Sequence, residues 1–170
     1  SLKKHILSTE YSFISDLIKA KDLKRSILVF DLSSKKKLIL VSLKKNISGS
    51  QVENLGAKFF DLFKDNKISQ YEVVSDTLSS KQNILIGHFF HGLNLKSYKF
   101  EKYKTKKIKN NFNIIITGKN KPSLRDQIKF KAIEEGSFYT RDLVSEPGNI
   151  LHPDEYAKRL NSLKKHGLKI

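Results

Sequence analysis

Apolar and polar residues alternate in blocks along the chain, and these blocks predict strands and helices in turn. Short runs rich in β-branched and apolar residues, typical of strands, occupy 26–32, 37–43, 70–74 and 112–118. The first two runs are separated only by the polar segment SSKKK, which predicts a β-hairpin. The last run, FNIIITG, is apolar almost throughout, and such a composition is typical of a buried strand.

Two helices are predicted between these strands, each beginning at a capping box. In a capping box, a Ser hydroxyl and a Glu or Gln side chain three residues later satisfy free backbone amides at the helix start. Ser50 with Glu53 predicts the first start, and that helix is expected to end near Asn66. Ser79 with Gln82 predicts the second start. The apolar residues that follow fall on one face of each helix: Val52, Leu55, Phe59, Leu62 and Phe63, then Ile84, Leu85, Phe89 and Leu93.

A longer helix is predicted after the strand at 112–118, with Ser123 as its N-cap and Asp126 in its first turn. Because strands and helices alternate, the predicted fold class is α/β, with a mixed β-sheet flanked by helices. The first twenty-odd residues are ambiguous between helix, strand and loop. The buried face of the long helix is expected to consist of Ile128, Ala132, Gly136, Tyr139 and Leu143.

The segment TRDLVSEPGNILHPDEYAKRL, at 140–160, predicts the end of this helix and the start of another. Pro147 cannot continue a helix and pushes the preceding residue out of the αR region, so the long helix should end near Ser145. Gly148 and Asn149 tolerate left-handed or turn geometry. A short turn between two helices is therefore expected here.

The last predicted helix begins at Pro153, whose missing amide suits the first helical position. Asp154 and Glu155 complement the positive end of the helix dipole. Gly167 predicts the end of this helix, and the residues LKI that follow predict the start of a strand. The buried face of the helix is expected to be Tyr156, Leu160 and Leu163.

Composition sets limits on what the chain does. With 170 residues, 38% of them hydrophobic, it can bury a core of the size usual for one domain. The net charge of +16 indicates either an anionic partner, such as nucleic acid or a membrane surface, or a composition shaped by an A- and T-rich genome. The lysines are spread along the whole chain, which favours the compositional interpretation.

The residue types also exclude some chemistry and some locations. The chain has no Cys, which excludes disulfides and Cys-based zinc sites. Its longest apolar runs are too short to span a bilayer, and its first residues lack the apolar core of a signal peptide. We therefore predict a cytoplasmic protein with no membrane partner.

No catalytic or metal-binding constellation is predicted within the chain. His88 and His91 in GHFFHG can share one helix face, but no HExxH and no neighbouring acidic residue accompanies them, so packing or surface roles are favoured. His152 is interpreted as a turn residue. The segment TGKNKPS lacks the spacing of a phosphate-binding loop, and no GxSxG motif occurs.

The basic and aromatic segment YKFEKYKTKKIK, expected to be extended, allows two interpretations. Its lysines could hold a nucleic-acid backbone while its aromatic rings stack on bases. Alternatively, aromatic residues at every second position pack into the core and the lysines stay solvated, and this structural interpretation is favoured. The candidate nucleic-acid contacts are Lys99, Lys102, Lys104, Lys106 and Lys107.

Two segments resemble the leucyl aminopeptidase (cytosol aminopeptidase) family. The first is GSFYTRDLVSEPGNILHPDEYAKRLNSLKKHGLKI, with its Arg-Asp-Leu, an acidic residue before Pro, an Asn, and a Pro-acidic helix start. The second is GLNLKSYKFEKYKTKK, at 92–107. The resemblance implies a two-domain metallopeptidase that removes N-terminal residues from peptides, with a macro-domain-like, three-layer N-terminal domain. It also implies a catalytic domain that holds two zinc or manganese ions and assembles as a hexamer.

The metal ligands and catalytic residues of that family lie beyond the segments that carry the resemblance, so no residue here is assigned such a role. The resemblance implies a non-catalytic N-terminal domain at 1–143, and a connector with the first helix of a catalytic domain at 144–170. Alone, this part is expected to be inert, with a role in assembly or regulation and with its own catalytic domain as partner. The alternative is a basic nucleic-acid-binding α/β module, and some bacterial members of the family bind DNA.

Overall fold

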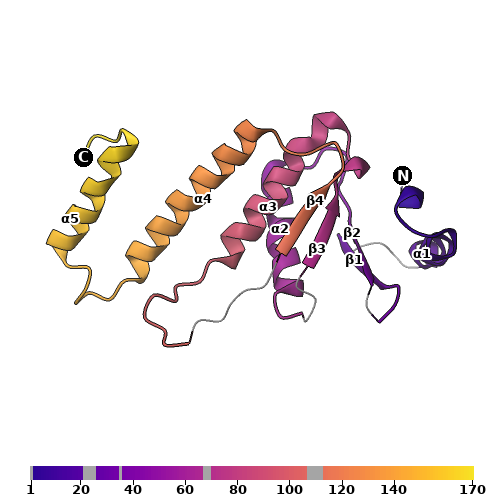
Figure 1. Cartoon of the computed structure of the whole chain (residues 1–170), viewed down its shortest axis with the longest axis horizontal. Helices are drawn as coiled ribbons and strands as arrows, with labels where there is room; N and C mark the ends of the chain where they lie inside the picture. The colour runs from indigo at the N-terminus through magenta and orange to yellow at the C-terminus, as the bar shows by residue number, and fades with distance from the viewer. Residues whose placement is uncertain (1, 21–25, 35, 67–69, 107–112) are drawn as a thin grey trace.

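Helices and strands alternate along most of the chain. The computed structural model describes residues 2–20, 26–34, 36–66, 70–106 and 113–170 (Figure 1). Within these residues, helices flank strands of both directions, which confirms the predicted α/β class. No helix in the described part of the chain has the length and apolar character needed to cross a membrane.

The first two strands form the predicted hairpin. β1 (Ile27–Asp31) pairs antiparallel with β2 (Lys37–Val41), so that Ile27 lies opposite Val41. The amide of Ser42 donates to the carbonyl of Ser26 at 2.8 Å and extends the pairing by one step. β-Branched and apolar side chains fit this pleated, half-buried surface, which explains why the sequence pattern located it.

The other two described strands form a parallel pair. β3 (Gln70–Val74) lies beside β4 (Asn113–Thr117), and within the described residues the four strands make two separate two-stranded sheets. The strand predicted at 112–118 is confirmed over Asn113–Thr117, but the prediction that it is buried is wrong. Ile114 packs against the core, but Ile115 points to the other face and is 43% exposed, because helices cover only one face of this pair.

The core lies between two helices and the strands. α2 (Gly49–Phe63) and α3 (Asn83–Ser97) pack against each other, and aromatic rings fill the space between them and β3. The ring of Phe59 lies 5.4 Å from that of Phe89 and 5.6 Å from that of Tyr71, both edge to face. The buried cluster comprises Val52, Leu55, Phe59, Phe60, Phe63, Tyr71, Phe89 and Leu93.

The start of α2 corrects one predicted capping box. The N-cap is Ser48, whose Oγ accepts from the amide of Gln51 at 3.3 Å, while Oε1 of Gln51 accepts from the amide of Ser48 at 3.0 Å. The prediction of Ser50 with Glu53 is wrong because an equivalent Ser-x-x-Gln pattern lies two residues earlier. The second predicted box, Ser79 with Gln82, is confirmed before the 3-10 turn Ser80–Gln82 that leads into α3.

The end of α2 and the extent of its buried face also differ from the prediction. The helix ends at Phe63, with Lys64 as C-cap, rather than near Asn66. Leu62 is 59% exposed, although it was expected on the buried face. Phe60, which the pattern did not include, is 3% exposed and takes part in the core instead.

The long helix α4 (Leu124–Ser145) begins and ends where the sequence predicts. Oγ of Ser123 accepts from the amide of Asp126 at 3.1 Å, and Glu146 is the C-cap. The expected buried face is wrong, however. Phe130 is the buried residue of α4, at 8% exposed, and Ile128 is 61% exposed. The helix packs on α3 through a side that mixes aromatic and acidic residues, which a purely apolar pattern does not locate.

The last helix confirms its predicted limits. α5 (Pro153–Asn161) begins with Pro153 at its first turn, and the 3-10 turn Ser162–His166 that follows it ends at Gly167, whose φ of +82° is left-handed. The predicted buried face is only partly formed, since Tyr156 is 43% exposed while Leu160 and Leu163 are half-buried.

The turn between α4 and α5 uses ordinary backbone geometry. Gly148 and Asn149 lie in this turn, but neither adopts a positive φ, so the left-handed option considered from the sequence is not used. At the other end of the chain, α1 (Ser8–Ala20), preceded by the 3-10 turn Leu2–Lys4, buries Ile14 completely. Its Glu10 pairs with Nζ of Lys36, in the hairpin turn, at 3.0 Å.

Candidate functional site

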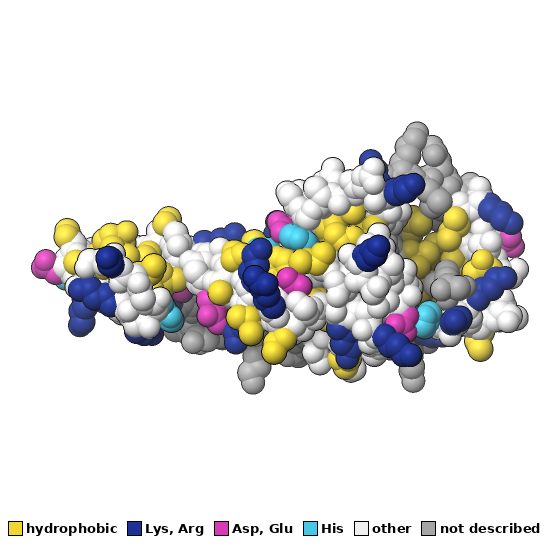
Figure 2. Space-filling view, turned by 90° about the horizontal axis from the view of Figure 1, so that it is seen from above, with side chains coloured by type: hydrophobic (Ala, Val, Ile, Leu, Met, Phe, Trp, Pro, Cys, Tyr) yellow, Lys and Arg dark blue, Asp and Glu magenta, His cyan; other side chains and the backbone are white. Residues whose placement is uncertain are grey.

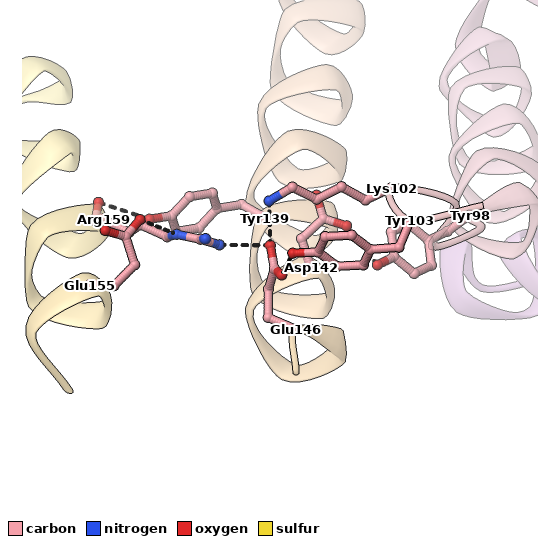
Figure 3. A network of polar contacts seen from close by, with 8 residues as sticks. All are labelled: Tyr98, Lys102, Tyr103, Tyr139, Asp142, Glu146, Glu155 and Arg159. Atoms are coloured by element: carbon pink, nitrogen blue, oxygen red, sulfur yellow. Dashed lines mark hydrogen bonds and ion pairs between the residues drawn. The ribbon is translucent and has the colours of Figure 1, made fainter. Parts of the chain in front are cut away.

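The carboxylate of Glu146 is the centre of a polar network at the end of α4. Its side chain is only 1% exposed. It accepts hydrogen bonds from Nζ of Lys102 at 2.5 Å, from the hydroxyl of Tyr103, and from Nη1 of Arg159 at 2.9 Å (Figure 3). Lys102 and Tyr103 lie in the segment after α3, and Arg159 lies in α5, so one carboxylate joins three parts of the chain.

Local sequence explains the position of this carboxylate. Pro147 forces Glu146 out of helical geometry, and Glu146 has φ −68° and ψ 137° while its amide still donates to the carbonyl of Asp142 at 3.1 Å. A carboxylate at the C-terminal end of a helix is unfavourable because the helix dipole is negative there. The two cations and the hydroxyl that surround Glu146 offset this repulsion.

The electrostatics of the network keep Glu146 ionised. Hydrogen bonds from Lys102, Tyr103 and Arg159 lower the pKa of its carboxyl from 4.5 to about 2. In return, the bond to Glu146 raises the pKa of Lys102 and of Tyr103, and the carboxylates of Glu146 and Glu155 raise that of Arg159. A carboxylate with such a low pKa and with its oxygens already bonded is a poor general base at neutral pH. The network therefore favours a structural role.

Further contacts extend the network along both helices. Nε of Arg159 donates to Oε1 of Glu155 at 3.0 Å, and the carbonyl of Arg159 accepts from the hydroxyl of Tyr139 at 2.8 Å. On the other side, the hydroxyl of Tyr98 donates to Oδ1 of Asp142 at 2.7 Å. Burial, and next the bond to Asp142, raises the pKa of Tyr98. The direction of α5 relative to α4 is thus set by several bonds from different segments.

The candidate nucleic-acid lysines lie beside this network. The segment that carries them forms turns rather than the expected extended strand within its described residues. Lys99, Lys102, Lys104 and Lys106 are exposed, while Lys107 lies outside the described residues. Lys102 is bound to Glu146, and Nζ of Lys104 lies 3.7 Å from Oε1 of Glu101.

Neither the aromatic rings nor the surface charge favours a nucleic-acid groove. The ring of Tyr98 stacks on Phe138 at 5.4 Å, and Tyr103 is bonded to Glu146. On the face drawn in Figure 2, Lys and Arg side chains are scattered rather than gathered in one stripe. Bases would have to displace Phe138 from Tyr98 in order to stack on it, which makes this segment a poor binding platform.

Both suggestive histidines are paired with carboxylates from other helices. Nδ1 of His88 lies 2.8 Å from Oε1 of Glu53 in α2, and Nδ1 of His91 lies 3.0 Å from Oε1 of Glu134 in α4. The sequence did not indicate these partners because they are 35 and 43 residues away along the chain. His91 is 6% exposed and packs against Phe130, as expected of a packing residue.

These pairs do not make a metal centre. In the described part of the chain, no three or more His, Cys, Asp and Glu side chains gather in a way that could hold a metal ion. His152 takes the N-cap position of α5, which agrees with its interpretation as a turn residue, and its side chain makes no capping bond. Among the described residues, the Glu146 network is therefore the most extensive polar site, and its sequence signal was the Glu-Pro step after a long helix.

The chain is similar in sequence to aminopeptidases. It is 37% identical over 109 residues to a probable cytosol aminopeptidase of Phytoplasma australiense, a match that covers 62% of this chain and 22% of that protein. It is 36% identical over 86 residues to a probable cytosol aminopeptidase of Rhodopseudomonas palustris, covering 46% of this chain and 17% of that protein. No protein-family profile matches the chain.

Solved structures share its fold. A mutant of tomato leucine aminopeptidase superposes with a TM-score of 0.70 at 19% identity, covering 94% of this chain and 34% of that chain. The bottromycin maturation enzyme BotP, in complex with Mn, superposes with a TM-score of 0.63 at 13% identity, covering 89% and 33%. The fold is thus that of an α/β domain found in aminopeptidase-like enzymes.

Sequence and fold together define the relationship more closely. The chain is similar in sequence to the leucyl aminopeptidase (cytosol aminopeptidase) family and shares its fold, in agreement with the resemblance of its motifs. It spans about a fifth of the length of these curated relatives and about a third of the length of the two solved chains. This partial coverage is consistent with an N-terminal domain of the family, and the nucleic-acid alternative is not favoured.

Proposed function

We propose that residues 1–143 form the non-catalytic N-terminal domain of a leucyl aminopeptidase, and that residues 144–170 connect it to a catalytic domain and supply the first helix of that domain. The match to the Phytoplasma australiense protein carries this proposal, because it reaches 37% identity yet occupies only 22% of that protein. The full enzyme is proposed to release N-terminal amino acids from peptides in the cytoplasm. Its N-terminal domain would be macro-domain-like.

The catalytic chemistry is assigned to the other domain. The family resemblance implies two divalent metal ions, zinc or manganese, and one structural neighbour was solved in complex with Mn. The residues described here do not fit such a centre, because no group of three or more candidate ligands lies together among them. No step of peptide hydrolysis is therefore derived from this part of the chain.

The role proposed for this part is mechanical. The bonds of Glu146 and Tyr139 to Arg159 hold α5 at a fixed direction from α4, and α5 is proposed to enter the catalytic domain. A rigid joint at this point would hold the N-terminal domain in one orientation relative to the active site. Such an arrangement would support assembly into a homo-oligomer, proposed to be a hexamer, and would shape the access of peptides.

The test compares two polypeptides made from the same gene. One is residues 1–170, and the other is the product of the whole reading frame. Each is incubated with leucine p-nitroanilide and with Mn²⁺ or Zn²⁺, and a chelator-treated sample serves as control. We expect turnover by the longer product only, and its loss with chelator. Hydrolysis by residues 1–170, or an inactive longer product with either metal, would contradict the proposal.

A further inference from the structure

Helix α4 presents two different faces. Phe130, Glu134 and Phe138 lie on the side that contacts α3 and the segment after it, where Oε1 of Glu134 bonds to His91 and the ring of Phe138 stacks on Tyr98. An α-helix turns once in about 3.6 residues, so the positions expected to be buried from the sequence fall on the opposite side. This outer stripe consists of Ile128, Ala132, Gly136, Tyr139 and Leu143.

The first half of the outer stripe has no cover among the described residues. Ile128 is 61% exposed, and Ala132 and Gly136 are exposed as well. A Cβ built on Gly136 would meet nothing within 4 Å. The adjacent Ile133 is 44% exposed. Ile128, Ala132 and Ile133 thus leave apolar surface of α4 uncovered, and an exposed apolar helix face is typical of an interaction surface.

The second half of the same stripe is already in contact with α5. The hydroxyl of Tyr139 donates to the carbonyl of Arg159 at 2.8 Å, and Tyr139 and Leu143 are half-buried. Figure 1 shows α3 and α5 on opposite sides of α4. Hydrophobic side chains also reach the surface of the narrow end of the molecule, which holds α5 (Figure 2). The exposed half of the stripe therefore continues an existing contact.

We propose that the outer stripe of α4 is the docking surface for the domain that follows α5 in the same polypeptide. This inference rests on the proposed function. Two observations favour that occupant over a second copy of the chain. α5 already contacts one end of the stripe through Tyr139, and it runs back alongside α4 from the turn between them, so the chain that continues from it leads toward the open end (Figure 1). In addition, the matched region is only 34% of the tomato enzyme, which leaves most of that chain outside it.

The composition of the stripe specifies what fits on it. Gly136 has no side chain, so the partner's backbone can approach α4 closely at this point. Ile128 and Ile133 precede that position on the helix and supply apolar contacts. The partner is therefore an apolar face, such as that of a helix, whose backbone comes closest to α4 at Gly136.

Cysteine labelling tests this surface directly, because residues 1–170 contain no Cys. Ile128→Cys and Ala132→Cys are each introduced into residues 1–170 and into the product of the whole reading frame, and the maleimide labelling rate at the introduced site is followed by mass spectrometry. Lys131→Cys is the matched control, since Lys131 lies on the same helix away from the stripe and its side chain is 76% exposed. Circular dichroism verifies that each variant is folded.

We expect labelling at Ile128→Cys and Ala132→Cys to be slower by roughly tenfold or more in the longer product, with no change at Lys131→Cys. Equal labelling rates in both polypeptides would overturn the proposal that the stripe is a docking surface. If the longer product were nevertheless an active aminopeptidase, the proposed function would still hold. Slow labelling already in residues 1–170 that depends on protein concentration would show a second copy as the occupant and would also overturn it. A reading frame that ends at Ile170 would refute both proposals.

Discussion

Nη1 of Arg159 in α5 donates to Oε1 of Glu146 at 2.9 Å, across the turn that separates α5 from α4. Oε1 of Glu146 also accepts from Nζ of Lys102 at 2.5 Å, so both cations converge on one oxygen atom. The carboxylate is buried, whereas each cation is partly exposed. Loss of the carboxylate would remove the acceptor that the two cations share. The stability of the joint between α4 and α5 therefore depends on Glu146.

Replacement of this carboxylate is expected to release α5 without unfolding the core. In Glu146→Gln, Lys102 and Arg159 both lose the charge of Glu146, and the guanidinium of Arg159 keeps only its bond to Glu155, while the cluster between α2 and α3 is untouched. Amide hydrogen exchange in 153–161 should become roughly tenfold faster, whereas exchange in α2 should not change. Glu155→Gln is the control, because Glu155 bonds to Arg159 from the same helix and should have a smaller effect. Equal protection in wild type and Glu146→Gln would contradict this role.

The same joint is expected to weaken in acid. The pKa of Glu146 is lowered from 4.5 to about 2 by its hydrogen bonds, so its contribution to stability is fully present above about pH 4.5 and is lost as the pH falls toward 2. Amide exchange in α5 should accelerate over this range in the wild type. The acceleration should be smaller in Glu146→Gln, which lacks the titrating group. A pH profile identical in the two proteins would show that another carboxylate is responsible.

Two glycines test the close contact between α2 and α3. A Cβ on Gly56 would overlap the carbonyl of Phe89, and one on Gly92 would overlap the backbone of Glu53. Because these atoms belong to backbone that cannot move aside, Gly56→Ala should lower the free energy of unfolding by about 1–3 kcal/mol in urea titrations. Measured in residues 1–170, Gly136→Ala is the matched control in an open helical position and should raise the free energy of unfolding by about 0.4–1 kcal/mol. A neutral Gly56→Ala would mean that the helices are not packed this closely.

Local signals predicted much of the fold, and contacts between distant segments account for the errors. Ser123 at the start of α4 and Pro153 at the start of α5 act on their own neighbours, so the sequence was sufficient to locate them. The prediction of the buried face of α4 was wrong because the apolar stripe is not the side of the helix that contacts α3. That side contains Glu134, whose charge became compatible with burial only once His91 and Asn94 lay opposite it.

The candidate site also has one part that the sequence predicts and another part that depends on distant contacts. The Glu-Pro step was visible in the sequence and predicted the end of α4. The donors to Glu146 were not visible, because Lys102 lies 44 residues before it in a segment without regular structure. Lys102 and Tyr103 were interpreted as solvated or core side chains, since no local pattern links them to a carboxylate so far along the chain. Only the packing of α4 on α3 brings them together.

The pairing of Glu134 with α3 gives the last prediction. Oε1 of Glu134 bonds to Nδ1 of His91 at 3.0 Å, and its Oε2 accepts from Nδ2 of Asn94 at 3.0 Å. Glu134→Ala would leave a buried imidazole and an amide without these bonds, so the free energy of unfolding should fall by about 1–3 kcal/mol. Glu135→Ala removes an adjacent carboxylate whose side chain is 68% exposed and should change stability by less than about 0.5 kcal/mol.

Urea titrations of the two variants against wild type measure the difference. Glu134→Gln gives a further test, because an amide can keep one bond to each partner and should recover part of the loss. If Glu134→Ala and Glu135→Ala were equally stable, the bonds of Glu134 to α3 would contribute nothing, and the packing of Phe130 and the bond of Arg141 to the carbonyl of Leu95 would be left to link α3 and α4. A large loss in Glu134→Ala with partial recovery in Glu134→Gln would establish this pair of bonds as the polar clamp between the two helices.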